Sequence, residues 1–391
     1  MKRIFFLIAF YVLTVGASAQ SLVPTPPMGW MTWNLFGENI NEEIIREMAD
    51  AMVSSGMKEA GYQYIMIDDG WQGGRDNKNN MLPDPKKFPS GIKALADYVH
   101  SKGLKLGIYS DAAQLTCAGY TASYGFENQD AKTFASWGID YLKYDYCHAP
   151  GDSVTAKVRY KAMADALKKS GREIVFSVCE WGQRYPWFWA AQLGGNLWRT
   201  TYDVRDSWSS LMYIYEINVK LDKYAGPGRW NDPDMLIVGL RGKSGPASDL
   251  GGTGCNDIEY MSNMSLWSIM ASPLVATNDI RNMSAVYKEI LTNPEVIAVN
   301  QDPLGKQAVR MISRDSVDVL LKPLSNGDHA VVVLNKGSKK QTVTLDFREI
   351  GLEGSFIIRD LWQKADIGRG AKWKGEVLPH GTKYYRLKKL N

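Results

Sequence analysis

The chain has 391 residues, of which 45% are hydrophobic and 23% charged, values close to those of ordinary soluble proteins. This length is enough for one large domain and a second, smaller one. The formal net charge of +4 is only mildly basic, and no Lys/Arg-rich run alternates with aromatic residues, which argues against a nucleic-acid-binding surface.

The first segment of the chain, residues 1–19, has the pattern of a secretory signal peptide. Lys2 and Arg3 supply the charged start, residues 4–15 form an apolar core, and residues 17–19 give a cleavage site of small side chains. The apolar core is too short to span a membrane. We therefore expect cleavage after residue 19 and export to an oxidising compartment, periplasmic or extracellular, without a membrane anchor.

Short apolar runs and helical segments then alternate along residues 20–304. The expected strands are rich in β-branched, aromatic or aliphatic residues and lie at 28–34, 62–67, 104–109, 139–145, 174–179, 197–199, 228–235 and 272–277. The expected helices lie at 44–60, 92–101, 129–137, 154–170, 207–220, 257–271 and 284–293. This alternation predicts an α/β fold, a (β/α)₈ barrel of parallel strands. A doubly wound sheet is the alternative, but the Gly-rich G-x-G-x-x-G motif of its dinucleotide-binding form is absent.

From about residue 305 the pattern changes to short strands separated by turns. These strands are expected at 317–321, 330–334, 341–345, 355–360 and 383–387. Because no long helix is expected among them, residues 305–391 predict a small antiparallel β-sandwich that follows the barrel.

Polar, charged or aromatic side chains stand at the carboxyl end of almost every expected strand, where barrel enzymes build their active sites. They are Trp33, Asp68, Asp69, Tyr109, Asp111, Lys143, Asp145, Glu180, Trp181, Arg199, Asp203, Asp232, Asp234, Asn278 and Asp279. A single Asp at such a position is often a turn former or a helix cap, so roughly half of them could be structural. Their coincidence at nearly all strand ends favours one shared site.

Asp145 and Asp203 are the candidate catalytic pair. Lys143 lies two residues before Asp145 on the same face of its strand, so its charge favours the ionised carboxylate that a nucleophile needs. Asp203 follows Trp198 and Tyr202, where burial could raise its pKa and keep a proton for a leaving group. Two carboxyls flanking one bond are the machinery of glycoside hydrolysis, about 5–5.5 Å apart in retaining enzymes and about 6.5–9.5 Å apart in inverting ones.

The motifs at these strand ends resemble those of the α-galactosidases of glycoside hydrolase family 27. They run in the same order along the barrel, and as a set they are highly specific. They are Met28-Gly29-Trp30, Ile67-Asp68-Asp69, Lys105-Leu106-Gly107-Ile108-Tyr109, Leu142-Lys143-Tyr144-Asp145, Cys179-Glu180-Trp181, Trp198-Arg199 with Asp203, Trp230-Asn231-Asp232-Pro233-Asp234-Met235 and Asn300-Gln301-Asp302-Pro303-Leu304-Gly305. The resemblance implies a (β/α)₈ barrel with a C-terminal antiparallel β-domain. It also implies hydrolysis of terminal α-galactosyl residues with retention, without a cofactor.

The resemblance also implies roles for individual residues. It assigns the nucleophile to Asp145 and the acid/base to Asp203. Residues that match or are expected in the galactose pocket are Trp33, Asp68, Asp69, Tyr109, Cys117, Lys143, Cys179, Glu180, Trp181, Arg199, Asp234 and Met235. The family's disulfide matches Cys117 and Cys147, whereas Cys179 and Cys255 have no obvious partners.

Two alternative substrates exist within the family. The N-acetylgalactosaminidases have a small residue at the position of Glu180, and the arabinopyranosidases are expected to have a longer Glu at the position of Asp68. Both residues therefore favour galactose.

Three activities outside the family are weighed as well. Lys143 could form a Schiff base, as in barrel aldolases. A metal hydrolase could be built on four strand-end carboxylates, namely Asp68, Asp69, Asp111 and Asp234, but the chain has only four His residues and none shows the spacing of metal ligands. A galactose-binding protein without catalysis would have lost one carboxyl, yet both members of the candidate pair are present.

Overall fold

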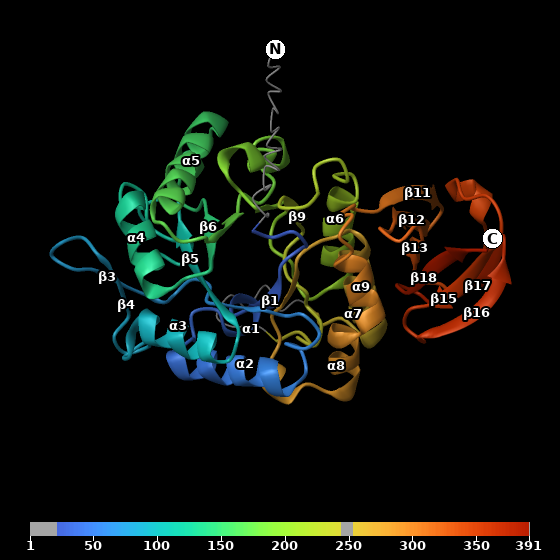
Figure 1. The fold of residues 1–391 in the computed structure, drawn as a ribbon, viewed down its shortest axis with the longest axis horizontal. Coiled ribbons are helices and arrows are strands. Elements are labelled where there is room, and N and C mark those ends of the chain that lie inside the picture. The colour runs from blue at the N-terminus through green and yellow to red at the C-terminus, as the bar shows by residue number, and fades with distance from the viewer. Residues whose placement is uncertain (1–21, 244–252, 391) are drawn as a thin grey trace, which may run out of the picture.

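Eight short parallel strands form a sheet that curves into a barrel in the computed structural model, which describes residues 22–243 and 253–390 (Figure 1). The strands are β1 (Met28–Met31), β2 (Tyr64–Met66), β5 (Lys105–Asp111), β6 (Tyr141–Asp145), β7 (Val175–Val178), β8 (Leu197–Arg199), β9 (Trp230–Asp232) and β10 (Leu274–Ala276). From β1 to β9 each strand pairs with the next strand of the sheet, and β10 pairs with β1. The chain just after β9 closes the ring, because Leu236 bridges to Ala276 and its amide donates to the Val275 carbonyl at 2.7 Å. The predicted (β/α)₈ barrel is confirmed.

Helices cover the outside of the barrel (Figure 1). They are α1 (Trp33–Phe36), α2 (Glu42–Ser54), α3 (Gly91–Ser101), α4 (Glu127–Trp137), α5 (Ser153–Lys169), α6 (Trp208–Asn218), α7 (Asp257–Ile269), α8 (Ala285–Thr292) and α9 (Pro294–Asn300). Side chains cap several of them; for example, the Asn41 carbonyl oxygen accepts the Ile44 amide at 2.8 Å at the start of α2.

Within the barrel, three differences from the sequence-based expectation stand out. The strand expected at 28–34 ends at Met31, and Trp33 begins α1 instead. The long loop expected after β2 contains a hairpin of β3 (Gln72–Arg75) and β4 (Met81–Pro83). The helix expected at 284–293 is followed directly by α9, because the Asn293 side chain caps a new helix that has Pro294 at its first position.

The chain after residue 308 forms the expected antiparallel β-domain. Its strands are β11 (Val309–Arg314), β12 (Val317–Pro323), β13 (His329–Asn335), β14 (Gln341–Asp346), β15 (Phe356–Asp360), β16 (Ala365–Gly370), β17 (Lys372–Val377) and β18 (Thr382–Lys389). Six of them form one sheet in the order β11-β12-β13-β18-β15-β16, and β14 pairs with β17. Trp373 of β17 packs on Tyr385 of β18 with ring centroids 5.2 Å apart, so the two sheets share an apolar core.

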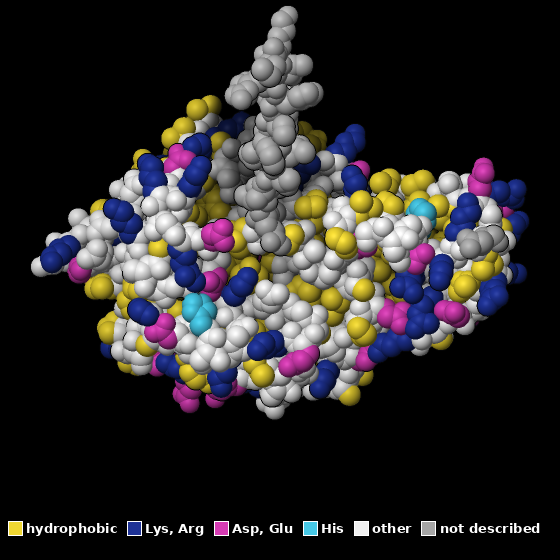
Figure 2. Space-filling view, in the orientation of Figure 1, with side chains coloured by type: hydrophobic (Ala, Val, Ile, Leu, Met, Phe, Trp, Pro, Cys, Tyr) yellow, Lys and Arg dark blue, Asp and Glu magenta, His cyan; other side chains and the backbone are white. Residues whose placement is uncertain are grey.

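Helices α6 and α7 lie between the barrel and the β-domain. The Trp208 ring stacks on the His380 ring with centroids 4.5 Å apart, and the hydroxyls of Ser268 and Tyr384 are hydrogen bonded at 3.0 Å. The outer surface carries many charged side chains, with Lys and Arg frequent on the β-domain (Figure 2). The predicted signal peptide lies outside the described residues. Within those residues, no helix combines the length and the apolar character that a membrane crossing requires.

Candidate active site

Lys143 is the buried cation of the site. Its Nζ lies 2.8 Å from Asp68 Oδ2 and 5.3 Å from the centroid of the Tyr109 ring. Burial alone would lower the pKa of the ammonium, but the carboxylates of Asp68 and Asp145 and the Cys179 sulfur raise this pKa well above its usual value. Lys143 is therefore protonated at neutral pH, and a Schiff-base role, which needs a free amine, does not fit it.

Asp145 ends β6 and is 3% exposed. Its Oδ1 accepts the Tyr146 amide at 3.0 Å, and its Oδ2 accepts the Tyr109 hydroxyl at 3.2 Å. Burial raises the pKa of Asp145 to about 7; Lys143 opposes this shift, and the charge of Asp203 adds to it. Lys143 favours the ionised carboxylate of Asp145, as expected, but desolvation is the larger effect.

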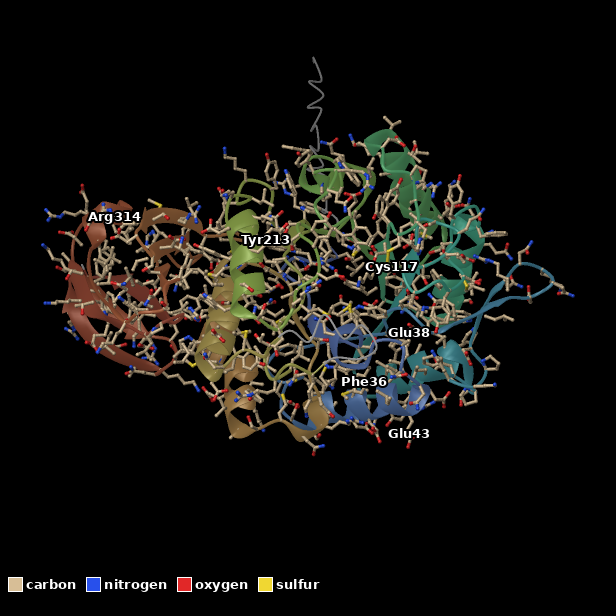
Figure 3. The ribbon with its side chains drawn as sticks, turned by 180° about the vertical axis from the view of Figure 1, so that it is seen from behind. Phe36, Glu38, Glu43, Cys117, Tyr213 and Arg314 are labelled. Atoms are coloured by element: carbon tan, nitrogen blue, oxygen red, sulfur yellow. A yellow bond between two sulfur atoms is a disulfide. The ribbon has the colours of Figure 1, made fainter. Side chains whose placement is uncertain are left out.

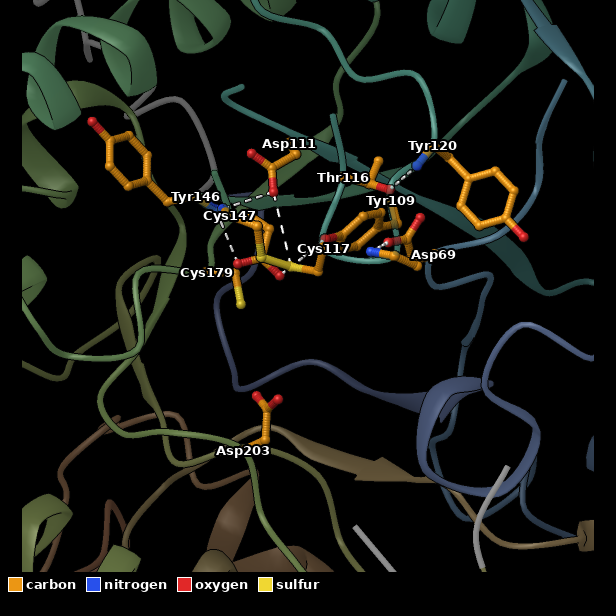
Figure 4. Close-up of a disulfide and its surroundings, with 12 residues drawn as sticks. Asp69, Tyr109, Asp111, Thr116, Cys117, Tyr120, Tyr146, Cys147, Cys179 and Asp203 are labelled. Atoms are coloured by element: carbon orange, nitrogen blue, oxygen red, sulfur yellow. Dashed lines mark hydrogen bonds between the residues drawn. A yellow bond between two sulfur atoms is a disulfide. The ribbon is translucent and has the colours of Figure 1, made fainter. Parts of the chain in front are cut away.

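Asp203 lies across from Tyr109 and from the disulfide of Cys117 and Cys147 (Figure 4), and its side chain is 43% exposed. Its Oδ1 accepts a hydrogen bond from the Arg199 guanidinium at 2.9 Å. Burial would raise the pKa of Asp203, but Arg199 and Lys143 outweigh burial and lower it. The sequence-based expectation of a raised pKa is wrong, because the charges of Arg199 and Lys143 outweigh the effect of burial.

Arg199 links Asp203 to Asp234 at the end of β8. Its guanidinium lies 3.2 Å from Asp234 Oδ1 and also donates to the Thr201 carbonyl at 3.2 Å, while its buried Nε has no protein partner. Burial raises the pKa of Asp234 to about 6, against the opposing charge of Arg199. Met235 is buried next to these groups, where a small cavity of about 20 Å³ is lined by Lys143, Arg199, Asp234 and Met235 among others. This cavity can hold about one water molecule.

Asp69 and the disulfide form the side of the site nearest β5. The Cα atoms of Cys117 and Cys147 are 5.0 Å apart, and the bond between these cysteines is the predicted one. It holds the loop after β5 against the end of β6, and the Tyr109 hydroxyl lies 3.1 Å from Cys117 Sγ. The amides of Gly70 and Ala118 each donate to Asp69 at 2.8 Å, and burial raises the pKa of Asp69 to about 6.

Glu180 is fully buried after β7, and its carboxylate is turned to Arg184. It accepts the Arg184 amide at 3.0 Å and forms an ion pair with the Arg184 guanidinium, which lies 4.6 Å from the centroid of the Tyr146 ring. Because both carboxylate oxygens of Glu180 are paired with Arg184, this residue fixes the conformation of the loop after β7. Sequence reasoning overlooked the ion pair of Arg184 with Glu180, although a spacing of four residues is typical of ion pairs in a helical turn.

The remaining expected pocket residues surround this centre. Cys179 is buried, and its Sγ lies 3.7 Å from an Arg199 nitrogen. Trp181 is half-buried with a φ of +54°, and Trp33 is half-buried at the start of α1. Cys255 is also buried and unbridged, so it forms no disulfide with Cys179.

The four carboxylates of the alternative metal site do not converge on one position that suits a cation. Asp68 pairs with Lys143 and Asp234 pairs with Arg199, while burial raises the pKa of Asp111 to about 9. Within the described ranges, one group has metal-type donors close together, and it combines Asp111 and Asp145 with Cys117 and Cys147. Its two sulfurs are joined in the disulfide and cannot serve as thiolate ligands.

Comparison with known proteins identifies the family. Residues 25–302 match the family model described as alpha galactosidase A, and residues 314–387 match the alpha galactosidase C-terminal beta sandwich domain. An alpha-galactosidase from Oryza sativa subsp. japonica is 48% identical over 375 residues, which cover 95% of this chain and 86% of the relative. Alpha-galactosidase A from Cellvibrio japonicus is 48% identical over 355 residues, covering 87% of this chain and 84% of that protein. The crystal structure of alpha-galactosidase I from Mortierella vinacea matches with a TM-score of 0.89 at 38% identity, over 95% of this chain and 99% of that one. The chain belongs to the alpha galactosidase A family, as its strand-end motifs predict.

Proposed function

We propose that the protein is a retaining α-galactosidase that removes terminal α-D-galactosyl residues, with Asp145 as the nucleophile and Asp203 as the acid/base. The main support is electrostatic. Two carboxyls from different strand ends lie close enough for the charge of Asp203 to raise the pKa of Asp145, and each has its own cation, Lys143 or Arg199. A pair of interacting carboxyls at the mouth of a barrel is the arrangement that double displacement at a sugar needs.

The reaction then proceeds in two balanced steps. The ionised Asp145 attacks the anomeric carbon, the bond to the leaving oxygen breaks, and Asp203 gives its proton to that oxygen. A water molecule then attacks the galactosyl–Asp145 ester while Asp203 takes a proton from it, which releases galactose in the α configuration and regenerates Asp145. No cofactor takes part in these steps.

The remaining charged groups hold the sugar. Asp68 and Asp69 are oriented by backbone amides and by Lys143, so their oxygens can accept bonds from galactose hydroxyls. Arg199 is fixed by Asp234 and Asp203, and its unpartnered Nε leaves a donor for a hydroxyl or a water molecule. Trp33, Tyr109, Trp181 and Met235 supply the apolar walls of the galactose site.

The test of the catalytic pair uses two isosteric variants. Asp145→Asn is expected to abolish turnover of p-nitrophenyl α-galactoside, because the amide is no nucleophile. Asp203→Asn is expected to accumulate a galactosyl-enzyme with a substrate that has an activated leaving group, detected by intact-protein mass spectrometry. Near wild-type rates in either variant would refute the assignment.

Substrate choice is tested on the wild-type enzyme. Hydrolysis of p-nitrophenyl α-galactoside is expected to exceed that of the α-N-acetylgalactosaminide and the β-L-arabinopyranoside. A preference for either of the other two glycosides would contradict the identification of galactose.

The parts of the chain take the following roles in this proposal. Residues 20–304 form the catalytic barrel, residues 305–391 form the β-domain, and residues 1–19 direct export to the periplasm or the outside of the cell. N-terminal sequencing of the exported protein is expected to begin at Gln20; an uncleaved chain in the cytoplasm would contradict export.

A further inference from the structure

Three loops meet at one side of the barrel mouth. The first lies between α1 and α2 and carries Glu38, the second follows β2 and carries Asp69, and the third follows β5 and carries Cys117. Figure 3 shows Glu38 and Cys117 on the same side of the barrel, away from the β-domain. Strands β1, β2 and β5 are neighbours in the sheet, so their carboxyl ends bring the three loops together.

A lysine joins the first two loops. Lys87 Nζ donates to the Glu38 carbonyl at 3.0 Å and to the Gly70 carbonyl at 2.8 Å. Gly70 has a φ of +95°, and a β-carbon there would lie 3.2 Å from the Cα of Glu38. The two backbones are therefore in close contact, and glycine adopts this conformation without strain. Two of the three ammonium donors of Lys87 thus hold backbone carbonyls of different loops.

A tyrosine attaches the third loop to the same point. The Tyr120 hydroxyl donates to Glu38 Oε2 at 2.6 Å, and Lys87 Nζ lies 5.3 Å from the centroid of the Tyr120 ring. The hydrogen bond to Glu38 raises the pKa of Tyr120 to about 12, so the hydroxyl keeps the proton that it donates. The Tyr120 amide donates to Thr116 Oγ1 at 2.9 Å (Figure 4), and its carbonyl accepts the Thr116 amide at 2.8 Å, which closes a tight turn around Ala118. We call Glu38, Lys87 and Tyr120 the loop clasp.

Both sides of the loop clasp lead to Asp69. Gly70, whose carbonyl is held by Lys87, donates its amide to Asp69 Oδ1 at 2.8 Å. Ala118, inside the turn that Tyr120 closes, donates its amide to Asp69 Oδ2 at 2.8 Å. Each oxygen of this buried carboxyl is therefore oriented by one loop, and the clasp fixes both loops.

We propose that Lys87 and Tyr120 are positioning residues of the galactose site and act through Asp69. This inference rests on the proposed α-galactosidase function and adds two residues to the same site. A carboxylate binds a sugar hydroxyl well only when its oxygens are held in place, so a looser clasp weakens sugar binding. Asp145 is oriented by other groups, the Tyr109 hydroxyl and a backbone amide, so bond cleavage itself should change little. KM should therefore change more than kcat.

The first test compares single variants on p-nitrophenyl α-galactoside. Lys87→Met removes both carbonyl contacts and is expected to raise KM by about tenfold, with kcat within about twofold of the wild type. Tyr120→Phe removes one hydroxyl, too small a change to prevent folding, and is expected to raise KM by about threefold. Lys86→Met is the matched control, because Lys86 is exposed in the same turn as Lys87, and it should leave both constants unchanged.

A double-mutant cycle tests whether Lys87 acts through Asp69. The substrate is α-galactosyl fluoride, whose reactive leaving group keeps weak variants measurable. Lys87→Met is expected to lower kcat/KM about tenfold in the wild type but less than about twofold in Asp69→Asn, because the carboxylate that Lys87 positions is then already absent.

Two results would overturn the inference. One is an unchanged KM in both Lys87→Met and Tyr120→Phe, and the other is an equal loss for Lys87→Met with and without Asp69→Asn. If the wild type hydrolyses no α-galactoside, the proposed function itself fails, which is a different outcome.

Discussion

The two candidate catalytic carboxyls have opposite charge preferences in the free protein. Burial raises the pKa of Asp145 to about 7, whereas Arg199 and Lys143 lower that of Asp203. The mechanism needs the reverse, an ionised Asp145 and a protonated Asp203. The productive protonation state is therefore a minor one in the free enzyme, and the pH dependence of kcat/KM should reveal this.

The pH profile should depend on the leaving group. α-Galactosyl fluoride needs little protonation of its leaving group, so its kcat/KM follows the ionised fraction of Asp145 and is expected to rise with pH up to about 7 and then level off. An alkyl α-galactoside also needs a protonated Asp203, and its kcat/KM is expected to fall above pH 7. The fall arises because, once Asp145 is ionised, the fraction that keeps a proton on Asp203 decreases with every further pH unit. A fluoride profile that is already level from pH 5 upward would show that Asp145 titrates like an ordinary carboxyl.

At the scale of single elements, the loop after β7 depends on one buried ion pair. Glu180 is fully buried, and burial raises the pKa of its carboxyl even though Arg184 opposes this shift. The same loop continues into Tyr185 and Trp187, which line a groove between this loop and helix α6. Glu180 thus stabilises the conformation of the loop after β7.

Removal of the cation from this pair should be costly. Arg184→Met leaves the buried Glu180 without its cation, with only the hydrogen bond from the backbone amide of residue 184, and is expected to lower the free energy of unfolding by about 3 kcal/mol, measured by urea denaturation at pH 7. The double variant Glu180→Gln with Arg184→Met should recover part of that loss, because a neutral amide costs less to bury than a carboxylate. A double variant less stable than Arg184→Met alone would contradict this explanation.

The sequence predicts elements well where burial is strong and poorly where it is weak. All eight barrel strands lie within or next to the expected ranges, because both faces of a barrel strand are buried and its residues form a short apolar run. Strand β16 was missed since nearly all its residues are exposed, and the hairpin of β3 and β4 contains two glycines that look like a loop. Strands β11 and β17 were missed for a related reason, because β11 has no fully buried residue and β17 buries only Trp373 and Val377.

The site residues were accessible to sequence reasoning because each stands at a strand end. Lys143, Asp145 and Arg199 all lie at the mouth where the barrel topology predicts them. What the sequence could not provide is the pairing between them. The contact of Arg199 with Asp203, which reverses the expected pKa shift, depends on the path of the chain after β8.

At the scale of the whole molecule, the barrel and the β-domain are joined by a buried cluster around Asp318 of β12. The Asp318 side chain is fully buried and accepts the hydroxyl of Tyr215 from α6 at 2.8 Å. Arg310 and Lys336 each lie 3.0 Å from it, and both also pair with Glu216 of α6. Since α6 (Trp208–Asn218) follows the segment that carries Asp203, this cluster connects the β-domain to an element next to the site.

The Asp318 cluster should make stability depend on pH with a definite sign. Burial would raise the pKa of Asp318, but hydrogen bonds from Ser313, Tyr215, Lys336 and Arg310 outweigh burial and lower it below the usual value near 3.8. A carboxyl with a lowered folded-state pKa stabilises the fold above its unfolded pKa and loses that contribution as pH falls through its folded pKa. Asp318→Asn is therefore expected to lower the free energy of unfolding by about 3 kcal/mol at pH 7, with a difference from the wild type that shrinks below pH 4. Calorimetric melting at pH 7 and pH 3 measures both effects.

The matched control is Asp366→Asn, which removes an exposed partner of Arg359 and should change stability by no more than about 0.5 kcal/mol. Equal melting temperatures for Asp318→Asn and Asp366→Asn at pH 7 would show that the cluster does not hold the two parts of the molecule together.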